Sequence, residues 1–131
     1  MADQTPQDLD LTPEIINIEL QQGTDNTITF QLTNNAGVGV DLTLDAVSFT
    51  AKDDFDGTAM IETMTNAAGF HEDPTSGETT FILTKEDLTT LTPTEESQWR
   101  YEVRRIFSGT LREVIYIHGI ITLKPSVGLS V

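Results

Sequence analysis

Carboxylates crowd one short segment of the chain, where Asp54 and Asp56 precede Gly57. Acidic residues at this spacing before a glycine occur in calcium-binding loops. The EF-hand register fails, because it would place Lys52 at the first ligand position and Thr63 at the last. Two interpretations stay open: a calcium site formed by this loop alone, or an acidic turn whose Asp side chains bond nearby backbone amides.

The two histidines, His71 and His118, do not form a recognisable metal or catalytic site. A zinc site needs three or four donors, and the chain has no cysteine and no third nitrogen donor at suitable spacing. Neither histidine belongs to a nucleophile motif, and no glycine-rich phosphate cradle is present. Pairs of carboxylates are uninformative, since 21 acidic residues produce many accidental pairs. We expect surface or partly packed histidines, no metal, no cofactor and no enzymatic activity.

The net charge of the chain restricts the classes of partner that it is expected to bind. The chain of 131 residues has a net charge of -14, with 7 basic side chains. A protein that binds nucleic acid or an anionic membrane needs Lys and Arg to replace counterions, so neither is an expected partner. No apolar run approaches the roughly 20 residues that span a bilayer, and the first residues lack the features of a secretory signal. We expect a soluble protein made in the cytosol.

All four arginines fall on one predicted hairpin. In one interpretation Arg105 pairs with Glu113 and the other arginines flank Glu102 on a solvated face. In the other they form an interface, because Arg is enriched where proteins meet and would suit the acidic surface of a second copy or a neighbour. The candidate interface residues are Arg100, Arg104 and Arg112, with Tyr116 and Ile106 as the apolar part.

Apolar and polar residues alternate with a period of two along most of the chain, which predicts half-buried strands. One or two helical turns are predicted between Thr84 and Pro93, with Thr84 as the N-cap. Together these predict an all-β fold, an antiparallel immunoglobulin-like β-sandwich of about seven or eight strands with one short helical turn. The expected strands are 15–20, 26–32, 46–52, 59–64, 78–83, 98–107 and 111–123, with a short segment at 40–44.

Two pairings follow from the turns between these segments. Residues 15–20 and 26–32 are expected to form a hairpin across the turn at 22–25. The two longest strands are expected to pair with Phe107 facing Leu111. That register puts Trp99, Tyr101, Val103 and Phe107 on the buried face with Leu111, Ile115 and Ile117, and Arg105 opposite Glu113.

The ends of the chain differ in composition from its centre. Residues 1–14 are polar, acidic and contain two prolines, which predicts an arm that is flexible or docked on a partner. Residues 15–124 are expected to form the β-sandwich domain. After Pro125, which ends strand pairing, residues 125–131 form a small apolar tail that is frayed or laid against another chain.

The order of these pieces resembles the N-terminal domain of the upper baseplate proteins of tailed phages that infect Gram-positive bacteria. The matching pieces span Ile16 to Leu123, and one difference is Leu44-Asp45, where the family usually has a Gly-Ala turn. The resemblance rests on Ile18-Glu19-Leu20, Gln22-Gly23-Thr24, Ile28-Thr29-Phe30, Gly39 to Thr43, Val47 to Lys52, Gly77 to Thr84, Glu86-Asp87-Leu88, Tyr101-Glu102-Val103 and Gly119 to Leu123.

The resemblance implies a virion structural protein, made in the host cytoplasm, that anchors tail or baseplate appendages through contacts with other virion proteins and with further copies in an oligomer or ring. No receptor-binding or coiled-coil region follows the matching pieces, which leaves a small adaptor, a tail-completion protein, or a capsid-decorating, head-fibre or neck protein open. From a different class, a carbohydrate- or calcium-binding adhesin-like module also stays open. Exposed aromatic residues around one loop would favour that module.

Overall fold

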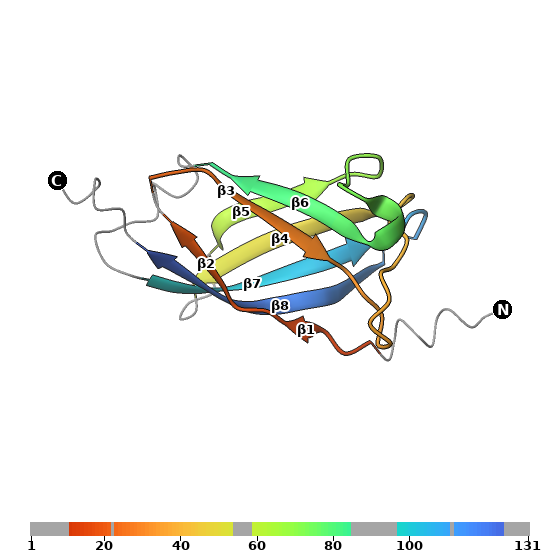
Figure 1. The fold of residues 1–131 in the computed structure, drawn as a ribbon, viewed down its shortest axis with the longest axis horizontal. Helices are drawn as coiled ribbons and strands as arrows, with labels where there is room; N and C mark the ends of the chain where they lie inside the picture. The colour runs from red at the N-terminus through yellow and green to blue at the C-terminus, as the bar shows by residue number, and fades with distance from the viewer. Residues whose placement is uncertain (1–10, 22, 54–58, 85–96, 111, 125–131) are drawn as a thin grey trace.

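A computed structural model of the chain describes residues 11–21, 23–53, 59–84, 97–110 and 112–124. Figure 1 shows that strands make up nearly all of the regular structure in these ranges. The strands are β1 (Glu14–Ile15), β2 (Ile18–Gln21), β3 (Asn26–Gln31), β4 (Ala46–Asp53), β5 (Ala59–Asn66), β6 (Glu78–Leu83), β7 (Ser97–Ile106) and β8 (Glu113–Lys124), with one 3-10 turn, η1 (Pro74–Ser76). No helix in the described ranges is long and apolar enough to cross a membrane.

The strands form two sheets. The large sheet has the order β1-β8-β7-β4-β5, with β2 also paired to β8, and the small sheet consists of β3 and β6. In Figure 1 the small sheet lies over one face of the large sheet. The large sheet therefore has one face against the small sheet and one outer face.

Aromatic side chains fill the space between the two sheets. Phe30 of β3 and Phe81 of β6 contact Phe49 of β4, with ring centroids 6.0 and 5.6 Å apart, and Phe30 also lies 5.8 Å from Tyr101 of β7. Stacked and tilted ring pairs at these distances add to the stabilisation from burial. Trp99 extends the same core and is 1% exposed. Trp99 and Tyr101 thus lie on the buried face, as the alternation predicted.

Most predicted strands are confirmed to within one or two residues. In β3, β4, β6 and β7 apolar residues at every second position face the core. The segment at 40–44 is not a strand. The predicted helical turn after Thr84 falls on residues 85–96, outside the described residues. The 3-10 turn η1 lies directly before β6, and Gly77 closes it with a left-handed φ of 84°.

The first strand differs from its prediction in two ways. It is interrupted at Ile16 and Asn17, and both of its parts, β1 and β2, pair parallel with β8 rather than with β3. The predicted hairpin is therefore wrong, since β3 crosses to the small sheet and pairs with β6. The turn signal at 22–25 marks a change of sheet, and local sequence does not distinguish that from a hairpin.

Gly119 of β8 allows the interrupted strand to lie close to the sheet. A Cβ at this position would stand 2.0 Å from the carbonyl oxygen of Ile16. The same oxygen accepts a 2.6 Å hydrogen bond from the Tyr101 hydroxyl, and the Asn17 side chain accepts one from the Ile120 amide. Tyr101 and Gly119 are direct neighbours across β7 and β8. Because Gly119 has no side chain, the Tyr101 hydroxyl can extend past it to the Ile16 carbonyl.

We predict that Tyr101→Phe lowers the free energy of unfolding by about 1–2 kcal/mol, because the Ile16 carbonyl loses its hydrogen-bond donor. Urea unfolding at neutral pH measures the change. An unchanged midpoint would show that this bond does not hold the N-terminal strand.

The same variant has a pH-dependent signature. Burial, with a smaller contribution from Glu14, raises the pKa of Tyr101. The folded protein therefore keeps the phenol neutral above pH 10, where an unfolded chain would ionise it, so stability falls as the pH rises beyond about 10. Tyr101→Phe should flatten this alkaline loss.

Candidate functional site

The pairing of β7 with β8 contains an irregularity that decides which side chains face the core. Val103 pairs with Ile117 and Arg104 pairs with Ile115, so Tyr116 is an extra residue on β8. Such a bulge shifts the side-chain alternation of the longer strand by one position. The predicted register is wrong here: Ile115 lies on the outer side, and Tyr116 is on the core side, 3% exposed.

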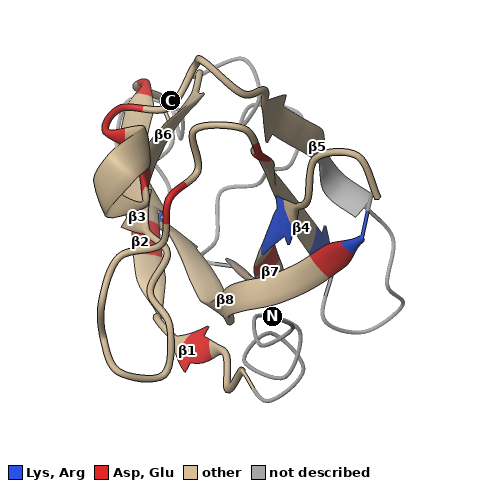
Figure 2. Ribbon diagram, turned by 90° about the vertical axis from the view of Figure 1, so that its right-hand side faces the viewer, with Lys and Arg blue, Asp and Glu red and all other residues tan. Residues whose placement is uncertain are grey.

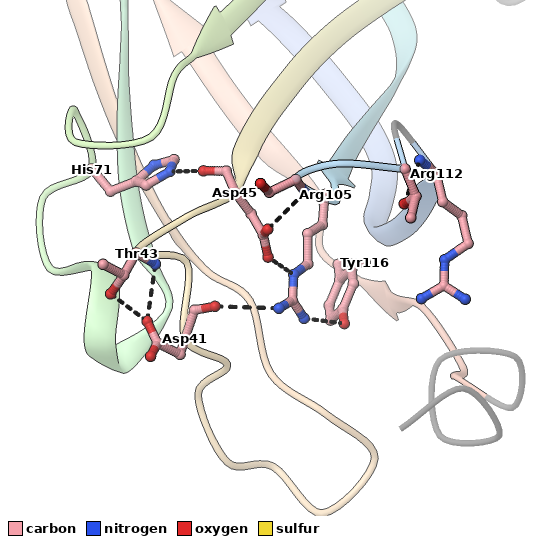
Figure 3. A network of polar contacts seen from close by, with 9 residues as sticks. Asp41, Thr43, Asp45, His71, Arg105, Arg112 and Tyr116 are labelled. Atoms are coloured by element: carbon pink, nitrogen blue, oxygen red, sulfur yellow. Dashed lines mark hydrogen bonds and ion pairs between the residues drawn. The ribbon is translucent and has the colours of Figure 1, made fainter. Parts of the chain in front are cut away.

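Arg105 lies on the core side of β7, at the end of the sheet where the loops meet (Figure 3). Its Nε donates to the Asp45 carboxylate at 2.8 Å, one terminal nitrogen donates to the Tyr116 hydroxyl at 3.0 Å, and the other donates to the Asp41 carbonyl at 3.2 Å. The Arg105 side chain is 14% exposed and that of Asp45 10%. The predicted Arg105–Glu113 pair is thus wrong, and Glu113 lies opposite Ile106.

Ionisation of Arg105 is maintained despite its burial. Desolvation opposes the charge, but hydrogen bonds and charge interactions with Tyr116 and Asp45 outweigh it, so the pKa of Arg105 lies above its ordinary value. A buried guanidinium that keeps its charge needs several acceptors in a fixed plane, and the three partners supply them. The contacts therefore position the loops that carry Asp41 and Asp45.

Asp45 connects this group to the loop between β5 and β6. Its second carboxylate oxygen accepts from the Ser108 amide at 3.0 Å, and its backbone carbonyl lies 2.7 Å from Nε2 of His71. Since a carbonyl only accepts, Nε2 of His71 must carry a proton. Nδ1 of His71 lies 2.9 Å from the Thr79 hydroxyl, which also accepts from Asn66. Both ring nitrogens of His71 are therefore engaged by the protein itself.

These contacts tie together three loops, at 32–45, 67–77 and 107–112. Phe107 lies beside two cations, with its ring centroid 4.3 Å from the Arg105 guanidinium carbon and 4.5 Å from that of Arg112. Asp41 accepts hydrogen bonds from the Thr43 hydroxyl and then its amide, which lower the pKa of the Asp41 carboxyl. The polar groups at this end thus bond to one another, which gives them a structural role.

Large apolar side chains are exposed on the loops that these contacts hold. Leu44 is 73% and Phe70 77% exposed, and the contact between Asp45 and His71 brings their segments side by side. Val38, on the loop between β3 and β4, is also exposed.

The outer face of the large sheet carries Arg100 and Arg104. Arg100 and Arg104 alternate with Glu102 on β7, and Arg104 pairs with Glu102 at 2.7 Å and lies 3.7 Å from Glu113. Figure 2 shows Lys and Arg on strands of the large sheet, with Asp and Glu beside them on β1, β7 and β8. A depression of about 530 Å³ opens between β1 and β7, lined by Ile15, Asn17, Arg100, Glu102, His118 and Ile120 together with Tyr101 and Gly119.

Two cations lie directly opposite each other on this face. Lys52 of β4 pairs with Arg100 of β7, and Arg100 pairs in turn with Ile120 of β8. Like charges in directly opposite positions destabilise a sheet. The same face also carries Glu102 and Glu113, so cations and carboxylates alternate on it.

The structure places the predicted interface residues in three locations. Arg100, Arg104 and Ile106 share the outer side of β7, and Arg112 lies in the loop beside Phe107. Tyr116 was expected on the same face as Ile106, which is wrong, because the bulge turns it to the core.

Residues outside the predicted set also contribute. Lys52 lies opposite Arg100 on the outer face. The sequence could have indicated this, because Lys52 occupies an outward position of a predicted strand. Asp45 was not singled out, because its partner Arg105 lies 60 residues away in sequence.

Neither histidine contributes to a metal site among the described residues, which contain no group of three or more His, Cys, Asp or Glu side chains able to hold an ion. His118 is partly exposed on the outer side of β8, which fits the expected surface or partly packed histidine, whereas His71 is buried. The candidate calcium residues Asp54 and Asp56 fall outside the described residues. Comparison with family models finds no match, and no curated protein matches the chain.

We predict that Asp45→Asn lowers the free energy of unfolding by about 3 kcal/mol, because it leaves the Arg105 guanidinium buried without its counter-charge. A double-mutant cycle with Arg105→Lys, measured by urea unfolding, gives the coupling free energy between the two side chains. A coupling free energy near zero would contradict a direct interaction.

We predict that Lys52→Gln raises the stability of the isolated chain by about 0.2–1 kcal/mol, because it removes the repulsion across β4 and β7. Thermal unfolding measures the change, with Lys124→Gln, at the end of β8, as the control. Equal effects of the two variants would show that the position opposite Arg100 carries no special cost.

Proposed function

We propose that this protein is a non-enzymatic structural component of a bacteriophage virion, an assembly domain of the tail or baseplate that anchors appendages through protein contacts. The observation that carries the proposal is the outer face of the large sheet, where Lys52 and Arg100 lie opposite each other beside exposed Ile15 and Ile120. Arg is enriched at protein interfaces, and the cores of such interfaces are apolar.

The strand order supports an immunoglobulin-like β-sandwich. The pair β3 and β6 faces a sheet in which β8, β7 and β4 are central, and an N-terminal strand pairs parallel with the last strand. This order agrees with the B–E and G–F–C strand sets of immunoglobulin-like domains. Many unrelated functions use this fold, so the fold agrees with an assembly role without identifying it.

The internal bonding at the loop end supports a role in binding rather than catalysis. His71, Asp45 and Arg105 are the titratable groups that burial brings together, and each is bonded to neighbours that hold it in place. A rigid frame of this kind suits a protein that presents surfaces to its neighbours. We infer that the partners are other virion proteins, with nucleic acid and membrane disfavoured by the net charge of -14.

Capsid decoration, a head fibre or a neck position remains the second candidate within the virion, since the same docking face would serve there. For an adhesin-like module, the exposed aromatic Phe70 beside Leu44 is the supporting observation. A glycan array probed with the wild-type chain and with Phe70→Ala, with and without calcium, separates that module from an assembly domain.

We predict that the protein is found in mature particles. Immunogold electron microscopy and mass spectrometry of purified particles, from cells that carry the gene on a phage genome, should locate it at the tail. The charge-reversed variant Lys52→Glu/Arg100→Glu should be lost from particles, whereas Lys124→Glu should be retained. Absence of the wild-type protein from particles would contradict a virion role, and head labelling would favour the second candidate.

A further inference from the structure

We propose that the open edge of β3 is a docking site for an extended segment of another protein, which adds to the small sheet as a third strand. The segment is uncharged where it pairs and carries aliphatic side chains at every second position. This site is separate from the outer face of the large sheet on which the proposed function rests. Three observations carry the inference: the direction of the backbone groups of β3, the absence of charge along the strand, and the apolar residues beside it.

A hydrogen bond at the end of β3 shows which of its backbone groups face β6. The Leu32 amide donates to the Gly77 carbonyl at 2.8 Å, one position beyond the last pair of the ladder. Since bonded and non-bonded pairs alternate along antiparallel strands, the even-numbered residues of β3 bond to β6. The amides and carbonyls of Thr27, Thr29 and Gln31 therefore point away from β6, and among the described residues they have no partner.

The far edge of β6 is covered, which agrees with this alternation. Glu78 exchanges two backbone hydrogen bonds with Asp73, of 3.1 and 2.9 Å, and the Thr80 carbonyl accepts from the Asn66 side chain at 2.8 Å. Glu78 and Thr80 thus use the backbone groups that point away from β3. Covering an edge in this way prevents unwanted pairing. In the described part of the chain, the small sheet therefore has one covered edge and one open edge.

Strand β3 also lacks the features that keep an edge strand from pairing. Charged side chains, prolines and bulges serve this purpose in natural sheets. No Asp, Glu, Lys, Arg or Pro occurs from Asn26 to Val40, and the pairing of β3 with β6 has no register shift. Because the chain has a net charge of -14, this uncharged stretch is a place where an uncharged segment can approach with little electrostatic repulsion.

The large sheet continues past the open edge. Phe81 of β6 contacts Phe49 of β4, whereas Phe30 of β3 contacts both Phe49 and Tyr101 of β7. Strand β3 therefore lies on the β7 side of the small sheet, and β8 with β2 extends the large sheet beyond it (Figure 1). Pairing with β3 of a second copy would bring two large sheets into the same space. The site thus suits a single extended segment.

Partly exposed aliphatic side chains lie on the inner side of the strands that flank the open edge. Ile28 shares the inner face of β3 with the buried Phe30, and Ile18 of β2 pairs with the buried Ile121 of β8. Both Ile28 and Ile18 pack against the core without being fully buried. Aliphatic side chains at every second position of an added strand would point to the same side and cover them. Backbone bonds combined with alternate side-chain contacts are typical of recognition by strand addition.

Hydrogen exchange measured by NMR tests whether the edge is open in the full chain. The amides of Thr27, Thr29 and Gln31 should exchange at least about tenfold faster than those of Ile28 and Phe30, which bond to β6. Equal protection of the two sets would show that the edge is already occupied, and would overturn the proposal.

Two peptides of one sequence, Lys-Thr-Val-Thr-Val-Thr-Lys, test the docking itself. One is N-methylated on its valines and the other on its threonines, so they share charge and composition but each can bond through only one edge. In an antiparallel pair with the valines facing the core, the threonine amides face β3. The valine-methylated peptide should bind with a Kd of about 1 mM or tighter, and the threonine-methylated one at least about tenfold more weakly.

The signals of the ¹⁵N-labelled chain locate the binding. Thr27, Thr29 and Gln31 should shift and become protected from exchange when the valine-methylated peptide is added. Thr29→Pro, which removes an outward amide that the fold does not use, should abolish binding, and circular dichroism checks that this variant is folded. Equal affinity of the two peptides, or shifts confined to other parts of the chain, would overturn the proposal. The particle experiment with the Lys52 and Arg100 variant does not involve β3, so the two proposals fail separately.

Discussion

Burial of one face of β7 is the constraint from which the rest of the molecule follows. Trp99, Tyr101 and Val103 must face the small sheet, because their aromatic and aliphatic surfaces form the centre of the core. Strand geometry then fixes the direction of every neighbouring side chain. Arg105 is carried inward and Arg100 and Arg104 outward, so one strand provides both the buried ion pair and the cations of the outer face.

The inward arginine is accommodated because it lies at the end of the core. There β8 contains an extra residue, and the bulge turns Tyr116 inward to accept from the guanidinium. Asp45 arrives from the loop before β4 and supplies the counter-charge. A buried charge with fewer partners would be costly, so the bulge and the loop structure are connected through this one side chain.

The sequence predicted strands well and their partners poorly. Alternation in β3, β4, β6 and β7 reports burial directly, so these strands and the inward Trp99 and Tyr101 were predicted from local pattern. The parallel pairing of β1 and β2 with β8 and the bulge at Tyr116 depend on contacts about 100 residues apart or on one irregular position, which periodicity does not encode. For the same reason the sequence predicted that the arginines cluster on one hairpin, but it did not predict that Arg105 faces the core while Arg100 and Arg104 face solvent.

The division of β7 into a buried and an outward face is tested most directly by the reactivity of its arginines. Phenylglyoxal modifies exposed guanidinium groups, and peptide mass spectrometry of the treated native chain identifies the modified positions. Arg100 and Arg104 are expected to react, whereas Arg105, held by Asp45 and Tyr116, should stay protected until the chain unfolds. Modification of Arg105 in the folded chain at the rate of Arg104 would contradict the account.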